Sequence, residues 1–168
     1  MTEISRMFVA ASRQTLSKWL ERIEKCLTPL TSEQIWWRGA DNSNAIGNLI
    51  LHLSGNVRQW IVSGVGGSPD HRDRDAEFAC RDSLPLEELR GRLGAAVRAA
   101  DEVLARLTED ELGQRRHIQG YEVTVLEAIH HVTEHFALHA GQILYATKLL
   151  TGQDLGFYRH LSGQRKSN

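Results

Sequence analysis

Apolar residues recur every three or four positions along four long stretches of this chain, and none of the four shows sustained alternation of apolar and polar residues. The first pattern is typical of a helix with one buried face, whereas alternation would have indicated a strand. The chain is therefore predicted to be an all-α protein, a four-helix bundle with long inter-helix loops. The predicted helices run from about Glu3 to Leu27, Asn44 to Ser63, Ser83 to Leu107 and Thr124 to Leu150.

Local signals mark where these helices begin and end. The first should stop before Pro29, because the residue that precedes a proline disfavours helical backbone. Ser43 or Asn44 is the expected N-cap of the second helix, and Gly152 is expected to close the last. Capping boxes, in which a threonine and the Glu or Gln three residues later satisfy each other's backbone N–H groups, are expected at three places. They pair Thr31 with Gln34, Thr108 with Glu111, and Thr124 with Glu127.

Two connections lack a helical pattern. The link that ends at Gly120 is expected to be irregular. Residues 64–82 form a long charged loop, and loops of that length are often functional lids or disordered links, so both interpretations stay open. Within this loop, Arg72 and Arg74 could clamp a ligand carboxylate, or they could form solvated pairs with the neighbouring aspartates.

Length, charge and cysteine content narrow the class of protein. A chain of 168 residues is expected to form one domain over residues 1–168. Its 20 Lys+Arg and 21 Asp+Glu give a net charge of −1 with no basic block, which disfavours nucleic acid and anionic membranes as partners. No apolar run is long enough for a membrane span. Cys26 and Cys80 match no paired metal spacing, and a cytoplasmic protein is expected to keep them reduced.

Candidate chemistry is concentrated in histidines of the second and last predicted helices. His131, His135 and His139 follow one another at four-residue intervals, and His52 lies within the second helix. Residues four apart lie about 6 Å apart on one helix face, so two such imidazoles can bind one ion. The ends of the triplet are about 12 Å apart, which is too far for metal–nitrogen bonds of about 2 Å. A third ligand must therefore come from another element, and His52 is the obvious supplier.

The expected positions of these side chains support a metal site without excluding a structural role. At about 100° per residue, His135 and His139 fall near the centre of the last helix's inward face, beside Phe136. A core-facing histidine is usually a hydrogen-bonded structural residue, and this alternative stays open. Two aligned imidazoles count against it, because without an ion the rings must donate and accept in a compatible chain.

A polar stripe on the second helix borders its apolar stripe and includes His52. Burying such groups without partners costs about 2 to 7 kcal/mol each, so a hydrogen-bonded or metal-centred pocket is expected there. The stripe consists of Asn48, His52, Asn56 and Gln59.

A competing motif overlaps the last helix. Residues 131–135 read H-x-x-E-H, the inverted zinc-peptidase pattern, in which Glu134 would be the general base. Glu134 lies roughly 100° around the helix from His135, toward the outer side, and His130 is also expected to be a solvated surface residue. The peptidase interpretation is therefore disfavoured.

Three segments carry a resemblance to the DinB/YfiT-like superfamily of metal-binding four-helix bundles, in a branch of unknown function. They are SEQIWWRGADNSNAIGNLILHLSGNVRQWI, DHRDRDAEF and EHFALHAGQILYATKLLTGQDLGFY, and the resemblance covers nearly the whole chain. It implies that His52, His135 and His139 bind a divalent metal, usually zinc or nickel, with Gly141 and Gln142 following the last ligand. It places His131 beside the site, and it implies a homodimer.

The resemblance and the histidine chemistry together lead to a functional hypothesis. Three neutral imidazoles leave a coordination position open, and zinc in such a site favours a deprotonated water or thiol at neutral pH. We therefore expect a transferase that uses a small-molecule thiol and an acceptor that the sequence does not identify. A metal-dependent hydrolase and a non-catalytic metal-binding stress-related protein are the alternatives. No carboxylate shares the histidine face, so the sequence offers no general base. The candidates for orienting ligands or contacting substrate are Asn48, Asn56, Gln59, His131 and Gln142.

Overall fold

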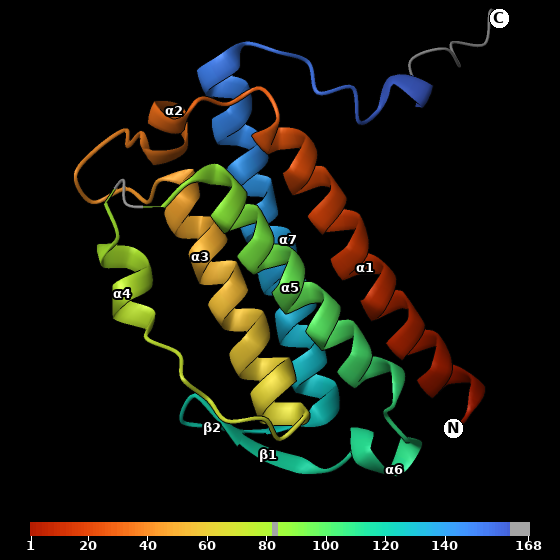
Figure 1. Cartoon of the computed structure of the whole chain (residues 1–168). Coiled ribbons are helices and arrows are strands. Elements are labelled where there is room, and N and C mark those ends of the chain that lie inside the picture. The colour runs from red at the N-terminus through yellow and green to blue at the C-terminus, as the bar shows by residue number, and fades with distance from the viewer. Residues whose placement is uncertain (82–83, 162–168) are drawn as a thin grey trace, which may run out of the picture.

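The computed structural model describes residues 1–81 and 84–161, and most of these residues are helical (Figure 1). Four long helices lie side by side, with α7 behind α5 in this view. Helix α1 packs on α5 and α7, and α3 packs on the same two helices. The long helices are α1 (Glu3–Leu27), α3 (Ile46–Val57), α5 (Leu86–Ala105) and α7 (Val125–Thr151). The shorter elements are α2 (Ser32–Trp36), η1 (Arg58–Val65), α4 (Arg74–Ala79), α6 (Glu109–Leu112), β1 (Arg115–Ile118), β2 (Tyr121–Thr124) and η2 (Arg159–Leu161).

Helix ends that depend on neighbouring residues lie close to their predicted positions. Helix α1 has the predicted bounds, and Gly152 ends α7 in a left-handed conformation with φ 66°. The capping boxes of Thr31 and Thr124 are complete. At Thr108, the Glu111 carboxylate accepts a 2.8 Å hydrogen bond from the threonine backbone N–H. Local capping chemistry therefore fixes these ends as the sequence indicates.

The second predicted helix differs from its prediction at both ends. Its N-cap is Ala45, not Ser43 or Asn44, and Asn48 Oδ1 accepts from the Ala45 backbone N–H at 3.1 Å. After Val57, the chain continues as the π-helix η1. The predicted start of the third helix at Ser83 lies outside the described residues, and α5 follows Pro85.

Two elements were not expected from the sequence. Strands β1 and β2 form an antiparallel hairpin across the Gln119-Gly120 turn. Both turn residues have positive φ, 53° and 84°, which suits a two-residue turn between twisted strands. The long charged loop contains α4, capped by Asp73, and packs on α3. We call residues 66–80 the strap, because in Figure 1 this segment runs alongside α3.

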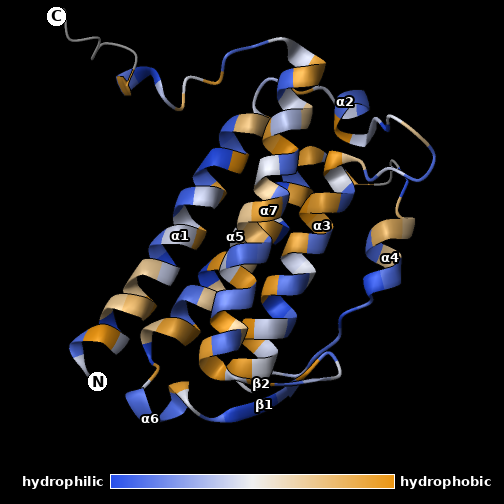
Figure 2. Cartoon of the chain, turned by 180° about the vertical axis from the view of Figure 1, so that it is seen from behind, coloured by the Kyte–Doolittle hydropathy of each residue, from blue (hydrophilic) through white to orange (hydrophobic). Residues whose placement is uncertain are grey.

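The interior is built from large apolar side chains contributed by the four long helices. Hydrophilic and hydrophobic bands alternate along α1, in keeping with a helix that has one buried face (Figure 2). Every helix within residues 1–81 and 84–161 is too short or too polar to cross a membrane. Fully buried side chains include Ile23, Leu27, Leu53, Leu89, Leu93, Ile129, Phe136 and Ile143.

The ion pair between Arg13 of α1 and Asp101 of α5 gives a first prediction. Arg13 donates hydrogen bonds of 2.6 and 2.9 Å to Asp101, and these bonds with the arginine charge lower the pKa of Asp101. A carboxyl with a lowered folded-state pKa stabilises the fold above its unfolded pKa of about 3.9, and that contribution is lost as pH falls through the folded value. Both side chains are partly exposed, so Asp101→Asn should lower the free energy of unfolding by at most about 1 kcal/mol at neutral pH.

Urea denaturation at neutral pH and at about pH 2 checks this expectation, because the difference between parent and variant should disappear once Asp101 is protonated. An equal destabilisation at both pH values would contradict it.

Candidate metal centre

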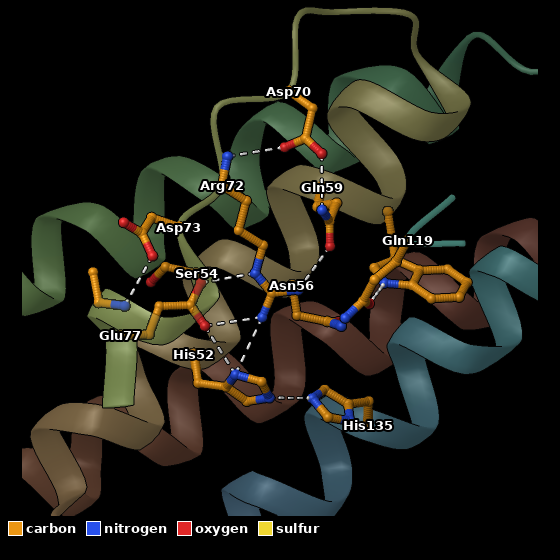
Figure 3. Close-up of polar contacts among 12 residues, drawn as sticks. His52, Ser54, Asn56, Gln59, Asp70, Arg72, Asp73, Glu77, Gln119 and His135 are labelled. Atoms are coloured by element: carbon orange, nitrogen blue, oxygen red, sulfur yellow. Dashed lines mark hydrogen bonds and ion pairs between the residues drawn. The ribbon is translucent and has the colours of Figure 1, made fainter. Parts of the chain in front are cut away.

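Three of the predicted histidines meet at one point between α3 and α7. His52 comes from α3, and His135 and His139 come from adjacent turns of α7. One ring nitrogen from each lies within 4.8 Å of the others, so the group can hold a metal ion. The Nε2 atoms of His52 and His135 are 2.9 Å apart (Figure 3).

The outer nitrogens of two of these rings already have partners. His139 Nδ1 donates to Gln142 Oε1 at 2.7 Å, and His52 Nδ1 donates to Glu77 Oε2 at 2.9 Å. A proton on Nδ1 leaves the Nε2 lone pair free, and ligand histidines in metal sites are held in this way. The donor set therefore fits a divalent cation: two imidazoles have fixed tautomers, and a third lies beside them.

Burial keeps the α7 rings neutral. Burial foremost, together with the neighbouring His139 and His52, lowers the pKa of His135 to about 3. Burial also lowers the pKa of His139, although the hydrogen bond with Gln142 opposes this shift. A neutral ring keeps the lone pair that a metal requires.

The sequence predicts that the rings of His135 and His139 lie near the centre of the buried face of α7. The structure places them at the margin of that face. His135 and His139 are only half-buried, whereas Phe136 is fully buried. Helix α7 is apolar around much of its circumference, so its periodicity leaves the direction of the core uncertain. Packing of Val132, Phe136 and Ile143 decides that direction, and it turns the histidines toward α3 and partly toward solvent.

The sequence interpretation missed the residue that fixes His52. Glu77 of the strap is only 9% exposed and reaches the His52 ring from α4. Arg72 donates to both Glu77 oxygens, at 2.7 and 2.9 Å, and to Gln59 Oε1 at 2.9 Å (Figure 3). Burial alone would raise the pKa of Glu77, but hydrogen bonds from His52 and Arg72 and the arginine charge outweigh it and lower the pKa. Glu77 is therefore an ionised carboxylate bonded to a candidate ligand.

The structure counts against Arg72 as a clamp for a ligand carboxylate and leaves that role of Arg74 untested. The Arg72 guanidinium is occupied by Glu77 and Gln59, and its side chain is only 4% exposed. Arg74 lies over the Phe78 ring, 4.9 Å from its centroid. The only sequence signal for Glu77 was the charged DHRDRDAEF segment, because nothing local connects it to a histidine 25 residues away.

A glycine on α3 makes this approach possible. A Cβ at Gly55 would overlap Glu77 Oε1 and would lie 2.9 Å from Arg72 Nε. Any side chain at this position therefore displaces the Arg72–Glu77 pair from α3.

Glu77→Gln is expected to lower the affinity for Zn²⁺ about 10- to 100-fold, as is usual when a partner of a ligand histidine is lost. Gly55→Ala should cause a loss of the same order through steric displacement of Glu77. Competition with a chromophoric chelator measures both affinities. The control is Gly91→Ala on α5, where an added Cβ meets no atom within 4 Å, and this variant should bind like the parent. Parent-like affinity in both test variants would show that Glu77 does not orient His52.

The polar stripe that runs along α3 into η1 finds its partners mainly in the strap. Asn48 donates to the Glu77 and Cys80 carbonyls at 2.8 and 3.0 Å, and so ties the strap to α3. Gln59 donates to Asp70 at 2.8 Å. The expected hydrogen-bonded pocket therefore exists, but Asn48 and Gln59 act through the strap and not on the histidine triplet.

His131 is not one of the three converging histidines, in keeping with the place beside the site that the resemblance implies. Its ring packs at a tilt against Trp60 with a centroid distance of 4.0 Å, and its centroid lies 5.4 Å from that of the His135 ring. Asn56 Nδ2 is 3.5 Å from His131 Nε2, and Asn56 Oδ1 is buried without a hydrogen-bond partner. Trp60 belongs to η1, and π-helical turns are frequent at functional sites.

The geometry gives no support to the inverted peptidase motif. That motif needs His131 and His135 as joint ligands, whereas the converging set contains His139 in place of His131. Glu134 is exposed, as is His130.

Comparisons with known proteins identify a family and a fold. The family described as "Protein of unknown function (DUF1572)" matches residues 3–165. A solved structure titled as a conserved protein from Enterococcus faecalis aligns with a TM-score of 0.74 at 18% sequence identity, over 91% of this chain and 100% of that chain. No curated protein shows a significant match to this sequence. At that identity, the structural likeness concerns the fold alone.

Proposed function

The chain belongs to the DUF1572 family of proteins of unknown function, and we propose that it is a metal-dependent enzyme that transfers a low-molecular-weight thiol to an acceptor. The observation that carries this proposal is the convergence of three imidazole nitrogens at one point. Two of these rings are oriented through their outer nitrogens by Glu77 and Gln142. Ligand histidines in metal sites are commonly oriented by such hydrogen bonds to the nitrogen that does not bind the metal.

We also propose that the chain is a single DinB/YfiT-like four-helix bundle over residues 1–168. The side-by-side arrangement of α1, α3, α5 and α7 supports this assignment. So does the origin of the three histidines, one from the second long helix and two from the last, which is the distribution that the resemblance implies.

The donor set suits zinc or nickel, because imidazole is a preferred ligand of both metals. Three protein ligands is the number found in catalytic zinc sites, which keep a fourth position for water or substrate. A divalent cation held by His52, His135 and His139 would supply the charge that lowers the pKa of a water or thiol bound to it.

The chain's own residues orient the ligands and line the approach to them. Glu77 and Gln142 hold the rings of His52 and His139 in place. His131 is held against Trp60 and is the next imidazole along α7. We assign it contact with the bound thiol or with the acceptor.

The carboxylate chemistry favours thiol transfer over hydrolysis. Glu77 is the only buried carboxylate among the described residues, and it is bonded to both Arg72 and His52. A carboxylate with this lowered pKa is a weak base. A thiol bound at a metal ionises more readily than water and needs a general base least.

The test begins with elemental analysis of protein purified without chelator, followed by cobalt substitution and titration with L-cysteine. Approximately one metal ion per chain and a shift of the cobalt spectrum are expected. S-methylcysteine, which has no ionisable S–H group, should leave the spectrum unchanged. A cobalt spectrum that responds to neither compound would refute thiol binding at the metal.

The metal-free arrangement favours one alternative, a non-catalytic metal-binding protein. Without an ion, the Nε2–H of His135 can donate to Nε2 of His52 across 2.9 Å, so the rings satisfy each other. If chelation unfolds the protein and thiols leave the cobalt spectrum unchanged, the ion chiefly holds the helices together. A folded metal-free form with thiol-sensitive cobalt supports the enzyme.

We further propose that the protein is a homodimer. The outer side of α7 exposes Leu138, Tyr145 and Leu149, which are 60 to 70% accessible, beside the small residue Gly141. Exposed apolar stripes of this kind often mark interfaces. Light scattering that shows a monomer at micromolar concentration would refute the dimer.

A further inference from the structure

A cavity of about 1040 Å³ lies beneath the strap and does not include the three histidines. Its walls come from α3, η1, the strap and α5, whereas the histidines lie between α3 and α7. Arg72 and Glu77 connect the two sites, because both line the cavity and also contact His52. We call this space the strap cavity.

Most of the surface area that faces the strap cavity is apolar, although charged side chains also line it. Leu51, Val62 and Leu84 line it together with Ala76 and Ala95. Ligand pockets typically have volumes of about 300 to 1000 Å³ and mostly apolar walls. The strap cavity has the size and lining of a site for a small organic molecule.

Gly91 of α5 widens the cavity without serving the protein's own packing. A glycine inside a helix destabilises it by about 0.5 to 1 kcal/mol relative to alanine. A Cβ at Gly91 would meet no atom within 4 Å, so no neighbouring side chain or backbone requires a glycine there. The absence of a side chain at Gly91 would allow a ligand to lie close to the α5 backbone.

The acidic groups of the wall are already bonded within the protein. Asp70 accepts from Gln59, and Asp73 caps α4. Glu77 is paired with Arg72, and Glu88 is paired with Arg92 at 2.6 Å. All four carboxylates of the wall thus have partners within the protein, and the charges of Glu77 and Glu88 are balanced by arginines.

One arginine of the wall is not paired with a carboxylate of the protein. Arg58 of η1 is exposed, lines the cavity and has no hydrogen bond or ion pair within residues 1–81 and 84–161. The cavity therefore combines an apolar interior with a permanently charged guanidinium, a group that binds carboxylates through two parallel hydrogen bonds.

We propose that the strap cavity is a binding site for a small apolar carboxylate. The hydrocarbon part lies against Leu51, Val62 and the open α5 surface at Gly91, and the carboxylate binds Arg58. This site is separate from the metal centre and does not depend on the activity proposed for it.

Isothermal titration of the full chain with decanoate and with decanol tests the proposal. The parent should bind one decanoate. Arg58→Gln should weaken decanoate binding about tenfold or more, because a hydrogen-bonded charge is lost, while decanol binding changes little. Gly91→Phe should abolish binding of both compounds by filling the cavity, and Ala95→Leu provides a second filling variant should the first fold poorly.

The matched control addresses a second hollow, which lies between α3 and α7 and has a volume of about 250 Å³. Leu149→Ser alters that hollow and should leave decanoate binding unchanged. Loss of binding in this control with retention in Gly91→Phe and Ala95→Leu would overturn the proposal. Absence of decanoate binding to the parent would do the same.

The titration is repeated with His135→Ala after chelation. Decanoate binding by this variant is expected, because the strap cavity does not contain His135. Its loss there would place the ligand at the metal centre and overturn the proposal, and its persistence would separate the two sites.

Discussion

His135→Ala is expected to abolish stoichiometric metal binding. Structural zinc sites gain about 10 to 16 kcal/mol from their full ligand set, or a few kcal/mol per ligand. Losing one of three histidines should therefore weaken Zn²⁺ at least about 100-fold, since 1.4 kcal/mol corresponds to tenfold. Metal content after gel filtration and chelator competition measure the loss. His52→Ala and His139→Ala should behave alike if the three rings share one ion.

Two neighbouring residues on α7 serve as controls for this loss. His130→Ala and Glu134→Gln change exposed side chains and should leave metal content unchanged. The metal-free His135→Ala protein should also stay within about 1 kcal/mol of the parent in unfolding free energy, because the ring is only half-buried. Full metal content in His135→Ala, or its loss in Glu134→Gln, would reject the assigned ligand set.

Phe136→Ala is expected to have the largest effect on stability. Phe136 is 0% exposed and is the largest fully buried side chain among the described residues. Replacing a buried phenylalanine with alanine costs about 3 to 5 kcal/mol through lost apolar transfer and the cavity that remains. Total stabilities of about 5 to 15 kcal/mol are usual, so this variant should be close to unfolding.

Urea denaturation measures the destabilisation of Phe136→Ala. The control is Leu138→Ala on the same helix, where the side chain is 60% exposed and the cost should stay within about 0.5 kcal/mol. A loss below about 1 kcal/mol in Phe136→Ala would mean that the core face of α7 has been assigned wrongly. Adjacent residues of one helix, His135 and Phe136, thus separate metal binding from stability.

Elements were predicted well where the information lies within a few residues. The bounds of α1 follow from its periodicity and from Pro29, and the caps at Thr31 and Thr124 are contained in four-residue motifs. The hairpin was missed although its signal was local. A Gln-Gly pair between residues that favour strands is a weak form of the hairpin pattern, and both turn residues have positive φ.

The candidate site was also predicted only as far as information within a single helix allowed. Helical spacing alone indicated that two neighbouring histidines of α7 could share an ion and that all three could not, and it made His52 the natural further ligand. The choice of His135 and His139, with His131 beside the site, came from the family resemblance. Spacing could not orient α7, because packing of apolar side chains sets the rotation of a helix within its neighbours. The prediction from spacing therefore overestimated how deeply His135 and His139 are buried.

The sequence by itself determined the helical periods, most of the caps and which histidines of one helix can share an ion, since each depends on the geometry of a single helix. Only the tertiary structure decided that Glu77 reaches His52, that Gly55 makes room for this contact and that a cavity lies beneath the strap. The reason is physical: these features depend on how a connection of irregular backbone folds over a helix. Such a path is fixed by buried polar groups finding partners across distant segments, and no periodicity in the sequence records it.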